Sequence, residues 1–271
     1  MKVGIVWPTP GLHGLLDDDV LRKLHETRAS HLRVNLDMNN PQAFDLGQQV
    51  LDAGFELLPV LDLDYMHPNI PAYGDFCLEV CERFRPGLVE LMNEPRSIHG
   101  LSPEAYRYLI EPTAERLQLY RPQCRVAFAG DCVRFDKHGP RFDDWLKNVN
   151  PLYPEFFDAV AVHTYREPGP PDATRYESRE QEYDALDEHC YGLPMIVTEV
   201  GWNISSVSEQ QQADYLYEEL CINADYGIEM TCIYAYISDR HAGFGVLRAD
   251  DQSARPAVEA IARFVDEHGE T

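Results

Sequence analysis

Short apolar runs alternate with amphipathic stretches along the 271 residues of the chain. The apolar runs are rich in β-branched residues and are typical of strands, and the stretches between them have the period of helices. The predicted strands are 2–7, 31–37, 55–62, 87–93, 124–130, 157–163, 194–199 and 230–237. The predicted helices are 17–29, 42–54, 70–84, 103–120, 141–148, 177–190, 207–226 and 254–267. Strands that alternate with helices pair in parallel, because parallel neighbours need a crossover connection.

Eight strand–helix units in a chain of this length match the size of a (β/α)8 TIM barrel of the α/β class. We expect residues 1–271 to form one such barrel as a single domain. The alternative is an open doubly wound sheet, but its Gly-x-Gly-x-x-Gly pattern is absent after the first strand. Ser102 before Pro103 predicts the start of a helix, and Gly54 and Gly227 stand where left-handed C-caps are expected.

The charge and cysteine content restrict the partners and the compartment. The chain has 46 acidic and 23 basic side chains, a formal net charge of −23. This field repels phosphate backbones and anionic lipids, so we expect neither nucleic acid nor a membrane as a partner. The seven cysteines form no Cys-x-x-Cys pair, and no signal-peptide pattern precedes the first strand. We therefore expect buried, reduced thiols and a cytoplasmic protein, with the oligomeric state left open.

Two glutamates stand where such a barrel carries its function, at the carboxyl ends of strands. Glu94 follows the largely apolar run 88–92, and Glu199 closes the run 194–198. They end the fourth and seventh strands, so inward-pointing side chains at these positions can meet across the mouth of the barrel. Hydrolysis of a glycosidic bond needs two facing carboxyl groups, one to protonate the leaving oxygen and one to attack or to activate water.

The motifs around these strand ends resemble those of the clan A retaining glycoside hydrolases. They are Asn-Glu-Pro at 93–95, Thr-Glu-x-Gly-Trp at 198–202 and His-x-Tyr at 163–165. The clan consists of (β/α)8 barrels and includes cellulases, mannanases, xylanases and β-1,3-glucanases. The resemblance follows the strand order of the whole chain. It implies a retaining β-glycoside hydrolase that acts on a β-linked poly- or oligosaccharide by double displacement.

By this resemblance, Glu94 corresponds to the acid/base and Glu199 to the nucleophile that forms the glycosyl-enzyme intermediate. Asn93 corresponds to the asparagine that hydrogen-bonds to the 2-hydroxyl of the sugar. An acid must hold a proton near neutral pH, so we expect a raised pKa for Glu94. Two partly buried carboxyl groups repel each other, which favours one protonated and one ionised group. This chemistry needs no cofactor, and we expect no metal site.

Further residues of the sequence resemble those that surround the two catalytic carboxyl groups in clan A enzymes. Arg33 on the second strand matches the arginine beneath the nucleophile, Tyr165 the tyrosine that hydrogen-bonds to it, and His163 a histidine of the sugar site. Many clan members end strand eight with a tryptophan that forms the floor of the sugar site, but this chain has Tyr236 in that segment. We expect Tyr236 and Trp202 to stack on sugar rings.

The short loops indicate an open groove and attack within a poly- or oligosaccharide, while the sugar and the linkage stay open. Two other functions also fit the sequence. A metal-dependent sugar isomerase or epimerase would use Glu94, Glu199 and His163 as ligands of a divalent cation. A non-catalytic carbohydrate-binding barrel is favoured by the missing tryptophan and disfavoured by the presence of both carboxylates.

Overall fold

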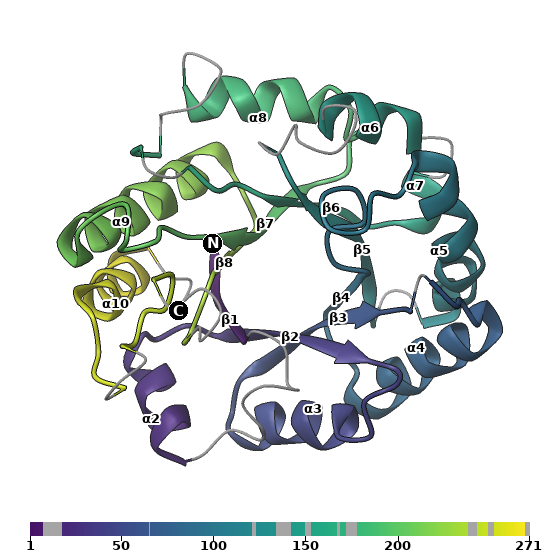
Figure 1. Ribbon diagram of the computed structural model, residues 1–271, viewed down its shortest axis with the longest axis horizontal. Helices are drawn as coiled ribbons and strands as arrows, with labels where there is room; N and C mark the ends of the chain where they lie inside the picture. The colour runs from purple at the N-terminus through teal and green to yellow at the C-terminus, as the bar shows by residue number, and fades with distance from the viewer. Residues whose placement is uncertain are drawn as a thin grey trace.

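The computed structural model describes residues 1–7, 18–64, 66–120, 123–133, 142–149, 153–166, 169–171, 178–237, 243–248 and 252–268. Eight parallel strands form a closed barrel in the order β1 to β8, so the predicted (β/α)8 fold is confirmed. The strands are β1 Lys2–Trp7, β2 His31–Asp37, β3 Glu56–Asp62, β4 Leu88–Leu91, β5 Arg125–Cys132, β6 Ala159–His163, β7 Met195–Val200 and β8 Met230–Ile233. Figure 1 looks along the barrel and shows the helices as a ring outside the strands.

The helices follow the strands, as the alternating pattern predicts. They are α2 Asp18–Glu26, α3 Ala43–Asp52, α4 Ile70–Phe84, α5 Pro103–Leu117, α6 Phe142–Val149, α7 Tyr153–Phe156, α8 Arg179–Asp187, α9 Glu209–Tyr226 and α10 Pro256–His268, with the 3-10 turn η1 Gln118–Tyr120. The predicted first residues 17, 141 and 177 lie outside the described residues. Ser102 caps α5 by accepting a hydrogen bond from the Ala105 amide, and Gly227 ends α9 in the left-handed conformation. The short helix α7 was not predicted, because four residues show no helical period.

Side chains fill both faces of the barrel strands. The outer face packs against the helices in a continuous apolar core. The interior holds a smaller cluster that consists of Val6, Leu58, Leu88, Ala127, Ala159, Ala161, Ile196, Met230 and Cys232. Arg33 pairs in register with Val6 and Leu58, and Glu90 with Ala127, so these two charged residues share the interior. A buried guanidinium and carboxylate inside an apolar barrel require each other as partners.

Two strands end earlier than predicted, and each end lies next to the mouth of the barrel. Strand β4 stops at Leu91 instead of residue 93, because Met92 and Glu94 have positive φ angles of 66° and 44° that a strand does not accept. Strand β8 stops at Ile233 instead of residue 237. Beyond it, the Tyr234 amide still donates to the carbonyl of Val200 on β7.

The structure also bears on two expectations from the composition, which concern membrane-spanning helices and disulfide bonds. Within the described ranges, no helix combines the length and the apolar character that crossing a bilayer demands. All seven cysteines are free thiols, and six of them are buried. These free and mostly buried thiols agree with the expectation of reduced cysteines.

Candidate active site

Three neighbouring strands place functional side chains in one row at their carboxyl ends. The parallel register pairs Cys132 on β5 with His163 on β6, and His163 with Glu199 on β7. Side chains at paired positions of adjacent strands leave the same face of the sheet. The amide of Val133 donates to the carbonyl of His163, and the amide of Thr164 to that of Glu199. The row is thus fixed by the sheet and does not depend on loop conformation.

Glu94 reaches this row from the turn that follows β4. Its φ of 44° lies in the left-handed region, which is uncommon for a residue other than glycine. Two hydrogen bonds hold the turn in place: the Glu94 amide donates to the carbonyl of Gly130 at 2.9 Å, and the Asn93 amide donates to Oδ1 of Asp62 at 2.9 Å. The turn therefore aims the Glu94 side chain across the ends of β5 and β6.

The structure brings the two predicted carboxyl groups together through a single imidazole. Nδ1 of His163 lies 2.8 Å from Oε1 of Glu94 and 3.5 Å from Oε2 of Glu199. Those two carboxylate oxygens are therefore no farther apart than the sum of these distances, 6.3 Å. Both glutamates are almost buried, with exposed fractions of 8% for Glu94 and 6% for Glu199. Two glutamates 105 positions apart in the chain thus face each other in one small site.

Arg33 connects Glu199, the candidate nucleophile, to the interior of the barrel through hydrogen bonds. Its Nη1 donates to Oε1 of Glu199 at 2.7 Å, and its Nε and Nη2 donate to the two oxygens of Glu90 at 2.9 and 3.0 Å. Nη2 also donates to Oδ1 of Asn93 at 2.8 Å. Burial lowers the pKa of Arg33, but the charges of Glu90 and Glu199 outweigh it and raise that pKa above its usual value. The guanidinium is therefore a permanent cation between two carboxylates.

Tyr165 completes the contacts of Glu199. Its hydroxyl donates to Oε2 of Glu199 at 2.6 Å. Burial, followed by the charge of Glu199, raises the pKa of Tyr165 well above its usual value, so the phenol keeps its proton. Each oxygen of Glu199 consequently accepts a hydrogen bond, one from Arg33 and one from Tyr165. Donors on both oxygens stabilise an ionised carboxylate.

Glu94 and His163 form a hydrogen-bonded ion pair. Burial raises the pKa of Glu94, but the hydrogen bond and charge of His163 and the thiol of Cys132 outweigh burial, so the pKa lies below its usual value. Burial lowers the pKa of His163, but the charges of Glu199 and Glu94 and the hydrogen bond to Glu94 outweigh burial, so this pKa lies above its usual value. The predicted raised pKa of Glu94 is therefore wrong for this state, and His163 holds the proton of the pair.

Trp202 and Tyr236 do not have the predicted role. The side chain of Trp202 is fully buried, where its Nε1 donates to the carbonyl of Gly169 at 2.7 Å and its ring packs against Tyr215. Tyr236 is 1% exposed, and its ring stacks on Trp7 at 5.0 Å between centroids. Stacking on a sugar needs an exposed ring face, so the expectation is wrong for both residues.

Tyr234 is the aromatic residue that sequence reasoning missed. It lies just beyond the end of β8, and its ring is partly exposed. Its ring centroid is 6.0 Å from that of Tyr165 and 5.7 Å from that of Phe244, in edge-on contacts. Tyr234 and Tyr236 alternate in the same segment, so the sequence alone did not distinguish them.

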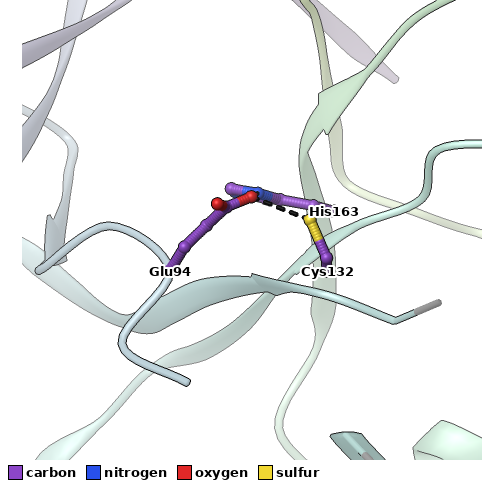
Figure 2. Close-up of side chains that lie close together, drawn as sticks. All are labelled: Glu94, Cys132 and His163. Carbon is purple, nitrogen blue, oxygen red and sulfur yellow. Dashed lines mark hydrogen bonds and ion pairs between the residues drawn. The ribbon is translucent and has the colours of Figure 1, made fainter. Parts of the chain in front are cut away.

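Glu90 and Cys132 also escaped the sequence analysis. Glu90 had a signal, because a glutamate inside a short apolar strand needs a buried partner. Cys132 had none, since a buried cysteine behaves as a small apolar residue. Its thiol donates to Oε1 of Glu94 at 2.8 Å. Figure 2 shows Glu94, Cys132 and His163 meeting at this point, and among the described residues this trio forms the one group of possible metal ligands.

The comparisons with known proteins bear on the fold. No family model and no curated protein matches the sequence. Among solved structures, a family 39 glycoside hydrolase from Bacteroides cellulosilyticus WH2 matches with a TM-score of 0.74 and 18% identity, over 97% of this chain and 63% of that one. At this identity the match shows a shared fold. The chain spans less than two thirds of the length of that enzyme.

Two other glycoside hydrolases match over nearly their full length. A mutant of Thermotoga maritima Cel5A in complex with cellobiose has a TM-score of 0.70 and 15% identity, over 96% of both chains. An endo-β-1,3-glucanase of family 128 from Sorangium cellulosum has a TM-score of 0.66 and 18% identity, over 97% of this chain and 98% of that one. The resemblance to clan A barrels is thus confirmed at the level of the fold.

Proposed function

We propose that this protein is a retaining β-glycoside hydrolase that cleaves a β-linked poly- or oligosaccharide in an open groove. The observation that carries the proposal is the limit of 6.3 Å between Oε1 of Glu94 and Oε2 of Glu199. Retaining enzymes hold their carboxyl groups about 5–5.5 Å apart, whereas inverting enzymes need about 6.5–9.5 Å to admit a water molecule. The spacing favours direct attack by a carboxylate.

In the proposed reaction, Glu199 is the nucleophile. Its carboxylate attacks the anomeric carbon while Glu94 gives a proton to the leaving oxygen, and a covalent glycosyl-enzyme forms. Glu94, now a carboxylate, then removes a proton from water, which attacks the anomeric carbon and releases Glu199. Arg33 and Tyr165 hold the nucleophile in one orientation through their hydrogen bonds to its two oxygens. Such positioning lowers the barrier because the reacting groups are already aligned.

The proton for the first step comes from the Glu94–His163 pair. Glu94 must take up a proton before it can act as an acid, and Nδ1 of His163 is 2.8 Å from its Oε1. Asn93 accepts a hydrogen bond from Arg33 through Oδ1, so its amide nitrogen is available to a sugar 2-hydroxyl.

Other observations support the substrate class and the compartment. The similar structures include a cellobiose complex and an endo-β-1,3-glucanase, both concerned with β-linked sugars. The partly exposed ring of Tyr234 is our candidate for the floor of the sugar site. Seven free thiols fit a reducing compartment such as the cytoplasm.

The stereochemistry of the product tests the proposal. A panel of β-linked glucans and mannans identifies a substrate, and proton NMR then follows the anomer that forms first. We expect the β-anomer first, with mutarotation to the α-anomer afterwards. An initial α-anomer would contradict the retaining mechanism. Glycan binding without hydrolysis would favour the carbohydrate-binding alternative, and activity that a chelator abolishes would favour the isomerase.

Substitution of Glu94 tests whether this residue is the acid/base. We expect Glu94→Ala to lower kcat by about 10²–10⁴ on a natural glycan, since general acid–base catalysis contributes that much. On an aryl glycoside whose leaving group needs no proton, azide should restore turnover and yield a β-glycosyl azide. Glu188→Ala at the exposed end of α8 is the matched control and should keep wild-type activity. Equal activity of Glu94→Ala and the control would remove Glu94 from the mechanism.

A further inference from the structure

Glu94, Cys132 and His163 present three different metal-binding groups to one point. Oε1 of Glu94 lies 2.8 Å from Sγ of Cys132 and 2.8 Å from Nδ1 of His163, and the three atoms lie within 4.8 Å of one another. Figure 2 shows the carboxylate reaching from its turn toward the imidazole and the thiol. Cys132 and His163 are register partners on adjacent strands, so two of the three groups are held by the barrel itself.

The donor set selects a class of metal ion. Thiolate, imidazole and carboxylate together suit Zn²⁺, whereas Mg²⁺ and Ca²⁺ require oxygen ligands. Zn²⁺ binds sulfur at about 2.3 Å and nitrogen or oxygen at about 2.0–2.2 Å, so tetrahedral ligand atoms lie about 3.3–3.7 Å apart. The two observed separations of 2.8 Å are shorter than these values by less than an ångström.

The charge around the trio also favours a cation. Glu94 and Glu199 both lie within 3.5 Å of the imidazole of His163. Arg33 already pairs with Glu90 and Glu199. A divalent ion that displaces the thiol proton would face two carboxylates and a thiolate.

We propose that Glu94, Cys132 and His163 bind Zn²⁺, and that this ion inhibits hydrolysis because it occupies the carboxylate and the imidazole that deliver the proton. The inhibition rests on the proposed glycosidase function, but the metal binding does not. Zn²⁺ displaces the protons on Cys132 Sγ and His163 Nδ1, and both leave to solvent. The ion is thus a reversible regulator of the site and has no place in the reaction itself.

Metal binding is tested directly on the full chain by equilibrium dialysis with ZnCl2, and by absorption spectroscopy with Co²⁺ as a probe. We expect one Zn²⁺ per chain and a thiolate-to-cobalt charge-transfer band. Cys132→Ser should abolish the band and weaken Zn²⁺ binding by at least about 10-fold. Glu94→Gln, which keeps the shape of the side chain, should also weaken Zn²⁺ binding. Cys221→Ser, at the one cysteine that is not buried, should change neither the charge-transfer band nor Zn²⁺ binding. Equal binding by the wild type and Cys132→Ser would overturn the site.

Inhibition is measured on the substrate found in the panel, with each variant normalised to its own metal-free rate. Zn²⁺ should inhibit the wild type, a chelator should reverse the inhibition, and Mg²⁺ should have no effect. In Cys132→Ser, the inhibitory concentration should rise by the same factor as the dissociation constant. Binding without inhibition would overturn the regulatory part. If Cys132-dependent binding occurs and no glycan is hydrolysed, the proposed function fails and the metal site stands.

Discussion

Asp62, a partly buried acid at the end of β3, positions the turn that carries Glu94. Its Oδ1 accepts from the Asn93 amide at 2.9 Å, and its Oδ2 accepts from Nδ2 of Asn35 at 3.1 Å. Burial raises the pKa of Asp62 from 3.8 to about 7, against the lowering effects of the Asn93 hydrogen bond and the charge of Arg33. The folded protein therefore keeps a proton that the unfolded chain releases.

This shift makes stability depend on pH in a defined direction. Because the folded state binds more protons than the unfolded state, the free energy of unfolding falls as pH rises from about 4 to about 7 and then stays level. A shift of about three units corresponds to roughly 4 kcal/mol. Asp62→Asn removes this titration, so its stability relative to the wild type should be greater at pH 8 than at pH 5. Urea unfolding at both pH values checks this, and an equal difference at both would contradict it.

Individual residues were predictable where a motif carried them. Glu94, Glu199, His163, Tyr165 and Arg33 converge as their motifs implied. The aromatic residues were not predictable in the same way, because a tyrosine or tryptophan near a strand end has the same local pattern whether it packs inward or faces the mouth. The protonation of Glu94 was also beyond the sequence, since it depends on contacts with residues distant in the chain.

Strand β5 contributes to the site through a glycine. Gly130 lies in the irregular part of β5, where the register with β6 shifts between Phe128 and Asp131. A Cβ atom at Gly130 would lie 2.5 Å from Nε2 of His163, 2.6 Å from Oγ1 of Thr198 and 2.7 Å from Oε1 of Glu90. These distances are below van der Waals contact. The absent side chain therefore makes room for the imidazole that joins the two glutamates.

We expect Gly130→Ala to displace His163 and to cost about 1–3 kcal/mol of stability, as overpacking of a tight interior does. Its activity should fall at least 10-fold, because His163 loses its contact with Glu94. Gly87→Ala is the matched control, since a Cβ there meets no atom within 4 Å, and it should be neutral or stabilising by about 0.4–1 kcal/mol. Thermal unfolding and a rate assay on both variants check the prediction. An unchanged rate in Gly130→Ala would show that the site tolerates a shift of the imidazole.

The strands and helices themselves were predicted well, apart from the short helix α7 and the ends of β4 and β8. Apolar period and capping residues are local, so they appear in the sequence. The ends of β4 and β8 depend on how the chain crosses the mouth. Met92 and Glu94 adopt left-handed conformations there, and no glycine marks them.

At the scale of the whole molecule, the fold follows from the repeated strand–helix unit, whereas the site arises only when the barrel closes. Arg33 from β2 meets Glu199 from β7, and Glu94 after β4 meets His163 from β6. Such contacts depend on the register of several strands at once, which no local pattern records. The motif resemblance named these residues, and the geometry adds Glu90, Cys132 and Tyr234 to them.

The most direct test of the proposed mechanism is covalent trapping. A 2-fluoroglycoside of an accepted sugar slows the second step, so the glycosyl-enzyme accumulates and its mass can be measured. Peptide mapping should then place one 2-fluoroglycosyl group on the peptide that contains Glu199. A label on any other residue would contradict the double displacement through Glu199. The absence of any label would contradict it as well, provided that the enzyme hydrolyses the corresponding glycoside without fluorine.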